Sequence, residues 1–324
     1  MRKIEFRTAV REAMEEEMRK DPLLFLFGYD VGEYGGEFRV SQGMHAEFGD
    51  RRVQDAPINE NGMVGLGVGA SITGTKAIIE IAFMDFLPMA MDAIVNQAAK
   101  FNYTFAGQRS VPLVLRTAMG GYIRAAEQHS QCLENWFVHV PGLKVVVPST
   151  GYDAKGLLKS AILDPNPVIF VEHKFMYPMK SEVPEEEYTI PLGSADVKRE
   201  GTDVTVIAYS YMVHLTLNVA KKLEKEGISV EVVDPRSLVP LDEETILNSV
   251  RKTNRVVIVH EAHERGGWGG EMAAIIADKA FSDLDAPIKR VGARNTPIPF
   301  PAQLEEFILP SEDRIEAAIR EVLA

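Results

Sequence analysis

Glu60 is the first residue of this chain whose type and surroundings point to chemistry. It follows the turn-like segment Pro57–Asn59 and stands directly before a run of apolar and glycine residues. Burial of a carboxylate in apolar surroundings favours its neutral form, which suits the group to share a proton with a ligand. A solvated glutamate, or one that merely begins a helix, is the alternative, and the residue type leaves both interpretations open.

Two aromatic residues follow an apolar run and form a second candidate. The run 76–83 ends at Phe83, and Phe86 comes three residues later. Ligands bind at the carboxyl ends of strands in open α/β sheets, so this pair is placed to stack on a flat heterocycle. Packing in the core is the simpler explanation of the same pair.

A polar cluster after the glycine-rich Met119–Gly121 loop is the third candidate. His129 lies in it, and histidine exchanges protons near neutral pH, although a structural histidine in a loop fits the pattern as well. Ser130 lacks the strand–turn–helix context of a nucleophile elbow, which argues against a hydrolase triad. His260 and His263 are three residues apart and follow a strand, whereas the zinc motif H-E-x-x-H needs a spacing of four on a helix.

The glycines of Gly65–Ala70 formally match the dinucleotide fingerprint G-x-G-x-x-G/A. The residues before them do not form a hydrophobic strand that feeds a tight turn, so the context differs from a Rossmann fold. Glycines that allow a helix to pack closely on a neighbour explain the pattern better. A nicotinamide-dependent dehydrogenase remains a competing hypothesis.

The elements that would position these residues alternate along the chain. Continuous apolar runs with helices between them predict a parallel sheet covered on both faces, in a doubly wound α/β arrangement. The predicted strands are 23–28, 76–83, 111–117, 144–149 and 167–173, and the predicted helices are 62–73, 87–101, 130–138 and 151–163. The N-terminal residues predict a charged helix capped by Thr8, with Val10, Met14 and Met18 on one face.

A second α/β set follows a segment rich in charge, proline and glycine. We expect a first domain over 1–185, a linker over 186–202 and a second domain over 203–324. The second set has predicted strands at 203–210, 228–235, 255–262 and 288–292, and predicted helices at 212–226, 242–252, 269–281 and 311–323.

Composition narrows the classes of partner. A formal net charge of −12 argues against nucleic acid, because phosphate binding needs a basic surface. The single cysteine, Cys132, excludes an internal disulfide. The N-terminus lacks the apolar core of a signal peptide, and no apolar run approaches the roughly 20 residues that span a bilayer. We therefore expect a soluble, cytoplasmic protein without a membrane partner.

Taken in order, these stretches resemble the E1 β subunits of the pyruvate, branched-chain and acetoin dehydrogenase complexes. Each motif is short, but the ordered set covers essentially the whole chain. The segments that carry the resemblance are Gly28–Gly36, Pro57–Glu60, His129–Gln131, Pro141–Ser149, Asp153–Leu158 and Val233–Asp242.

The resemblance implies a pyrimidine-binding domain followed by a transketolase C-terminal-like domain, with thiamine diphosphate as cofactor. Glu60 occupies the position of the family glutamate that hydrogen-bonds N1′ of the aminopyrimidine and favours its imino tautomer. Phe86 matches the aromatic residue that packs on the pyrimidine ring. His129 matches the β-subunit histidine near the reacting carbons, with a role in substrate binding or acyl transfer to lipoamide.

Some relatives also hold a potassium ion in a loop that corresponds to Ala161, Ile162, Asp164 and Asn166, with Leu113 nearby. The chain departs from many relatives at Ala82 and Ala93, where glutamine is common, and in the bulkier 122–124 stretch. Because position 82 lies near the expected pocket, the substrate stays open among pyruvate, the first expectation, a branched-chain 2-oxo acid and acetoin.

The magnesium motif of the family is missing. Gly49-Asp50-Arg51 begins like the Gly-Asp-Gly motif but does not continue to the asparagine expected about thirty residues later. An α subunit would therefore supply the magnesium and diphosphate side, in an α₂β₂ heterotetramer that docks to a lipoyl acyltransferase (E2) core. Two hypotheses compete with this one: the C-terminal half of a split transketolase or deoxyxylulose-phosphate-type enzyme, and a non-catalytic assembly or scaffold subunit.

Overall fold

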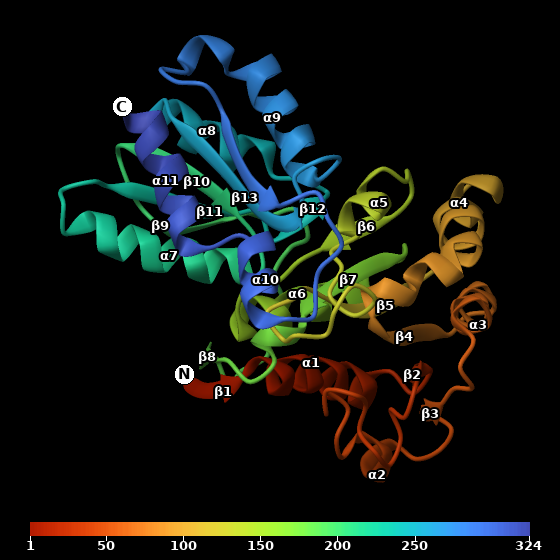
Figure 1. Cartoon of the computed structure of the whole chain (residues 1–324). Helices are drawn as coiled ribbons and strands as arrows, with labels where there is room; N and C mark the ends of the chain where they lie inside the picture. Colours follow the sequence, from red (N-terminus) through yellow and green to blue (C-terminus); the bar gives the residue numbers. More distant parts are fainter. The chain divides into compact units, whose positions relative to one another are not determined.

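The computed structural model describes all 324 residues, which form two compact units (Figure 1). The first unit comprises 1–119 and 136–192, and the second comprises 120–135 and 193–324. The observed division differs from the predicted domain bounds in two respects. The loop 120–135 belongs to the second unit, and the expected linker contains strand β9 (Asp196–Arg199), which pairs in the second sheet.

The first unit is built on a parallel sheet, as predicted. Its strands run in the order β6-β7-β5-β4-β2-β3, and every pairing among them is parallel. Strand β2 lies between β3 and β4, so the chain reverses its direction across the sheet there. Such a switch point leaves a crevice at the carboxyl ends of the strands. The bounds are β2 Leu24–Gly28, β3 Val53–Asp55, β4 Lys76–Phe83, β5 Leu113–Met119, β6 Lys144–Val146 and β7 Val168–His173.

Helices cover the sheet where the apolar period predicted them. Helix α3 (Glu60–Ile72) packs on β4, and α6 (Gly151–Leu163) packs on β5 and β7 as well as on α1 (Phe6–Lys20). The predicted apolar face of α1 is confirmed, because Val10, Met14 and Met18 are fully buried.

The predicted cap of α1 was wrong. Glu5, not Thr8, precedes its first turn. The reason is strand β1 (Arg2–Glu5), which pairs antiparallel with β8 (Lys180–Val183) and delivers the chain directly into the helix.

The predicted helix 87–101 is irregular. It consists of a 3₁₀ segment at Met84–Ala90, a π segment at Asp92–Ala98 and a short α4 at Ala99–Thr104. Pro88 accounts for the first break, because proline has no N–H to donate to the preceding turn. The predicted helix 130–138 is also shorter than expected, since only α5 (Glu134–Val138) is helical.

The second unit is a five-stranded sheet in the order β14-β13-β10-β11-β9, parallel except for the edge strand β9. Its predicted strands are confirmed as β10 Val204–Ala208, β11 Val230–Asp234, β13 Val256–His263 and β14 Lys289–Ala293. Its predicted helices are confirmed as α7 Tyr211–Glu224, α8 Glu243–Thr253, α9 Trp268–Lys279 and α11 Glu312–Leu323. The remaining short elements are α2 Met44–Phe48, the 3₁₀ turns Lys174–Met176 and Phe281–Asp283, β12 Ser237–Val239 and α10 Ala302–Ile308.

The core of the second unit lies between its sheet and the neighbouring helices α7 and α11 (Figure 1). Val206, Val232 and Val257 contribute from the strands, and Val219 and Ile319 from the helices. None of the helices in either unit combines the length and the apolar character that a membrane crossing needs.

Candidate active site

The candidate site lies at the carboxyl ends of three adjacent strands in the first unit. Tyr29 directly follows β2, Glu60 comes five residues after the end of β3, and Phe86 comes three residues after the end of β4. Since β2 lies between β3 and β4, the strand order brings together residues that are far apart in the sequence. This edge of the sheet is the crevice in which open α/β folds bind ligands.

Glu60 is the first residue of α3, and its side chain is buried, with 4% of the residue exposed. The preceding Asn59 caps the helix, because its side-chain oxygen accepts a hydrogen bond from the N–H of Gly62 at 2.8 Å. The positive end of the helix dipole favours a carboxylate at this position. Glu60 is thus an N-terminal helix glutamate, as one of the sequence interpretations had it, but its burial shows that it is not a solvated one.

Glu60 and Phe86 line the same cavity, which has a volume of about 640 Å³. That volume lies in the range of small-molecule sites, roughly 300–1,000 Å³. Its other lining residues are Ile58, Asn59, Asn61 and Met89. Ile58 and Met89 are 83% and 67% exposed, so the rim of the cavity presents apolar side chains to solvent.

An aromatic row fixes the position of Phe86. Its ring meets that of Phe83 edge to face, with centroids 5.8 Å apart. The ring of Phe83 meets that of Phe38 in the same manner at 5.4 Å. Phe83 is half-buried and packs between the two other rings, whereas Phe86 lines the cavity.

Tyr29 was not singled out from the sequence. Its hydroxyl oxygen is buried and has no hydrogen-bond partner of suitable geometry. Burial, and after it the nearby Glu60, raise the pKa of Tyr29 above its ordinary value. The phenol therefore stays protonated, and its hydroxyl lies beside the Glu60 carboxyl group at the site.

A buried ion triad lies on the strands next to the site. Arg116 on β5 donates two hydrogen bonds to Glu172 on β7, at 2.7 and 2.8 Å, and a third to Glu80 on β4. All three side chains are almost fully buried. Burial opposes the charge of Arg116, but Glu172 and Glu80 outweigh it and raise the pKa of the guanidinium. The triad therefore ties together the three central strands that lead to the site.

His129 lies in the 120–135 loop of the second unit. The loop is tied back on itself by hydrogen bonds from the N–H of His129 to the carbonyl of Ala126 and from the N–H of Gly120 to the carbonyl of Gln131. Near the end of the loop, Glu134 is fully buried and accepts a hydrogen bond from the hydroxyl of Tyr209 at 2.6 Å. Burial raises the pKa of Glu134 to about 7.

The predicted potassium loop is compact in the structure. Ala161 and Ile162 end α6, the N–H of Asp164 donates to the carbonyl of Ala161, and the N–H of Asn166 donates to the carboxylate of Asp164 at 2.9 Å. Leu113 begins β5. The ammonium of Lys144 pairs with the Asp164 carboxylate and already neutralises it. The loop therefore offers a cation chiefly backbone carbonyls.

Two other motifs lose their functional interpretation. Gly65–Ala70 lies inside α3 and not at a strand-to-helix turn, so the dinucleotide fingerprint is absent. A Cβ on Gly67 would lie 2.8 Å from Ile79, which confirms that this glycine serves close packing. His260 is fully buried on β13, and His263 on the same strand lies against the carbonyl of Thr296. The structure contains no group of His, Cys, Asp or Glu side chains arranged to hold a metal ion.

The sequence matches profiles of two domain families. The transketolase pyrimidine-binding domain covers 2–180, and the transketolase C-terminal domain covers 193–315. The β subunit of acetoin:2,6-dichlorophenolindophenol oxidoreductase of Bacillus subtilis is 48% identical, over 99% of this chain and 98% of its own.

Two further relatives carry the names of dehydrogenase subunits. The 2-oxoisovalerate dehydrogenase β subunit of Bacillus subtilis is 45% identical, over 97% of both chains. The mitochondrial pyruvate dehydrogenase E1 β-2 subunit of Oryza sativa is also 45% identical, over 97% of this chain and 85% of its own. Among solved structures, a split-gene transketolase described as an inactive β4 tetramer has a TM-score of 0.81 at 24% identity, over 99% of this chain and 98% of that one. That likeness concerns the fold.

Proposed function

This chain belongs to the family of 2-oxo-acid dehydrogenase E1 β subunits, and from that premise we propose that it supplies the pyrimidine-binding half of a thiamine diphosphate site. The observation that carries the proposal is the cavity in which the buried Glu60 and the aromatic Phe86 face one ligand-sized space. The reaction would be oxidative decarboxylation of a 2-oxo acid, with transfer of the acyl group to lipoamide.

The residues of the cavity fit an aminopyrimidine. Phe86 offers a ring face for stacking, and Glu60 offers a carboxyl group that can hold the proton shared with N1′ of the ring. Thiamine diphosphate, when bound, supplies the nucleophilic carbon that attacks the 2-oxo group. The low exposure of Glu60 limits the access of water to its carboxyl group. The chain thus contributes proton sharing and ring orientation.

A partner subunit is part of the same proposal. Asp50, in the segment that begins like the magnesium motif, is exposed and pairs with His45 at 2.6 Å. An α subunit would therefore hold magnesium and the diphosphate. The exposed Ile58 and Met89 at the rim of the cavity support such a contact, because exposed apolar side chains beside a site mark interaction surfaces. An α₂β₂ heterotetramer that docks to a lipoyl acyltransferase (E2) core is the proposed assembly.

His129 and potassium complete the proposal. His129 would assist substrate binding or acyl transfer in the assembled enzyme, and it is the candidate in the second unit. A potassium ion at the 161–166 loop would have a structural role. Its ligands would be backbone carbonyls, because the charge of the Asp164 carboxylate is already neutralised by Lys144. Elemental analysis of the purified assembly tests for it, and a complex that contains no potassium after purification in potassium buffer rejects the ion.

Glu60→Gln in the assembly with an α subunit tests the proposed role of the carboxylate. The amide keeps the size of the side chain but cannot take the shared proton, so we expect decarboxylation of pyruvate to slow by about 10²–10⁴-fold. Glu47→Gln is the control, because Glu47 is a surface carboxylate paired with Arg19 on the same unit. Equal rates of decarboxylation for Glu60→Gln and Glu47→Gln would show that the chain has only a structural role in the assembly.

Acetoin is the second candidate substrate. The relative at 48% identity is an acetoin oxidoreductase subunit, and so is a 45% identical chain of Cupriavidus necator. The same reconstituted enzyme decides between them, by comparison of the rates with pyruvate, branched-chain 2-oxo acids and acetoin. A preference for acetoin would change the substrate and leave the role of Glu60 in place.

A further inference from the structure

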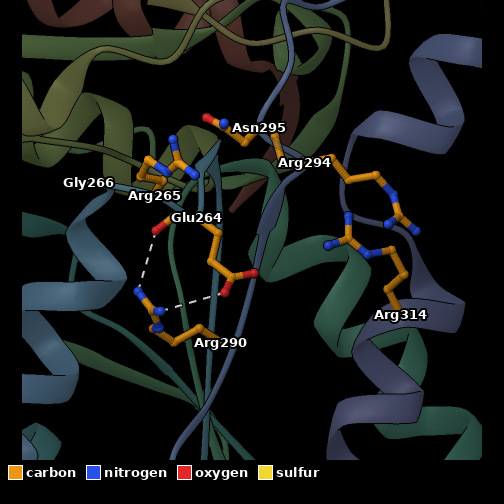
Figure 2. Close-up of a pocket in the computed structure, with 8 residues that line it drawn as sticks. Glu264, Arg265, Gly266, Arg290, Arg294, Asn295 and Arg314 are labelled. Carbon is orange, nitrogen blue, oxygen red and sulfur yellow. Dashed lines mark hydrogen bonds and ion pairs between the residues drawn. The ribbon is translucent and has the colours of Figure 1, made fainter.

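A pocket in the second unit is lined by an unusual concentration of positive charge. Its volume is about 560 Å³, and it is lined by residues from the loop after β13, from β14 and the loop after it, and from α11 (Figure 2). Four arginines and one glutamate line it, which gives three net positive charges in a chain whose formal charge is −12. Its lining residues are Glu264, Arg265, Gly266, Arg290, Ala293, Arg294, Asn295 and Arg314.

Only one of these arginines has a carboxylate partner. Arg290 pairs with Glu264 at 3.6 Å. Arg294 donates to the carbonyl of Phe307 and lies over its ring at 4.3 Å, so its neighbours are neutral. Arg314 donates to three backbone carbonyls, among them that of Gly292 at 2.7 Å. Arg265 is exposed and makes no ion pair.

The backbone holds two of the guanidinium groups close to one another without a counter-charge between them. In Figure 2 the guanidinium groups of Arg294 and Arg314 point toward each other. Burial, and after it the charge of Arg294, lower the pKa of Arg314. An anion placed between them would relieve this repulsion, and guanidinium forks match phosphate oxygens in paired hydrogen bonds.

We propose that this pocket binds a small phosphate-bearing anion through Arg265, Arg294 and Arg314. The volume fits a small molecule, roughly 300–1,000 Å³ being usual for such sites. Three unneutralised positive charges favour a ligand with more than one negative charge. Neither Glu60 nor Phe86 takes part, so the site is independent of the proposed thiamine diphosphate cavity.

Calorimetric titration of the purified full-length chain with inorganic pyrophosphate tests the proposal. We expect saturable binding that weakens as salt is added. Arg294→Gln and Arg265→Gln should each weaken it at least tenfold, and Arg294→Lys should fall between Arg294→Gln and the wild type, because lysine keeps the charge but loses the fork. Arg314 is left intact, because its hydrogen bonds also hold the backbone.

The matched control is Arg251→Gln, which removes the same charge from an exposed arginine on α8 outside the pocket. Its affinity for pyrophosphate should stay within twofold of the wild type. Absence of saturable binding, or an equal loss in Arg251→Gln and Arg294→Gln, would overturn the proposal. So would binding of a polyglutamate peptide by a chain that does not bind pyrophosphate, since that result would assign the pocket to an acidic protein partner.

Discussion

Replacement of Arg116 by methionine tests the role assigned to the buried ion triad. The change leaves the carboxylates of Glu80 and Glu172 without their partner, in a place where neither can reach water. Loss of one member of a buried pair costs about 3–5 kcal/mol, because a charge is left uncompensated. The first unit should stay folded but open far more often, since domain stabilities are roughly 5–15 kcal/mol.

Hydrogen exchange followed by mass spectrometry measures this effect in each unit separately. Peptides from β5 in the first unit should exchange about 10²–10⁴-fold faster in Arg116→Met, as the cost of 3–5 kcal/mol requires. Peptides from β10 in the second unit are the internal control and should change little. Arg19→Gln, which removes an exposed ion pair with Glu47, should leave both sets unchanged.

The loss of stability in Arg116→Met should depend on pH. Burial raises the pKa of Glu172 and the charge of Arg116 opposes that rise, so loss of Arg116 raises the pKa further. A carboxyl whose pKa is higher in the folded state favours folding below its unfolded pKa, and this contribution is lost as pH rises through the folded pKa. The variant should therefore be less damaged at pH 5 than at pH 7.5. Restoration by Glu80→Gln and Glu172→Gln together is also expected, and equal exchange in wild type and Arg116→Met would refute the reasoning.

Three other predictions follow from single contacts. Gly67→Ala places a Cβ 2.8 Å from Ile79 and should destabilise the first unit by about 1–3 kcal/mol in urea unfolding. Gly65→Ala has open space around it and should stabilise α3 by up to about 1 kcal/mol. A Gly65→Ala variant that is less stable than Gly67→Ala would contradict the packing. Burial raises the pKa of Glu134 to about 7, so its contribution to stability is complete below its unfolded pKa and is lost by pH 7–8. The wild type should therefore lose about 3 kcal/mol more stability than Glu134→Gln between pH 4.5 and pH 8, and parallel pH profiles in thermal unfolding would disprove this. Met89→Glu at the exposed rim should leave the melting temperature of the chain unchanged but abolish co-purification with the α subunit. If the variant still co-purifies with the α subunit, Met89 does not lie in the interface.

The main strands and most helices were predictable because each buries a continuous apolar run or an apolar face. Strand β9 was not, since Asp196–Arg199 is a short, charged edge strand without a buried alternation. The breaks within 84–104 depend on Pro88 and on local packing, which a helical period hides. The loop 120–135 gave no sign that it belongs to the second unit, because long-range contacts decide that.

The site could be predicted in part. Glu60 and Phe86 stood out by residue type and position, but their meeting in one cavity depends on the order β4-β2-β3, which a single sequence does not reveal. Tyr29 was missed for the same reason, although it directly follows a predicted strand. The arginine pocket left no pattern at all, since its arginines come from separate segments that only the fold assembles.

Calorimetric binding of thiamine diphosphate with magnesium to the separate and mixed subunits tests the central claim most directly. Arg294→Gln is introduced throughout, so that the arginine pocket does not bind the diphosphate group. In this background the account predicts no saturable binding to this chain alone, saturable binding to the complex with an α subunit, and at least tenfold weaker binding when that complex also carries Glu60→Gln. Tight, magnesium-dependent binding by the Arg294→Gln chain alone, unaffected by Glu60→Gln, would contradict it.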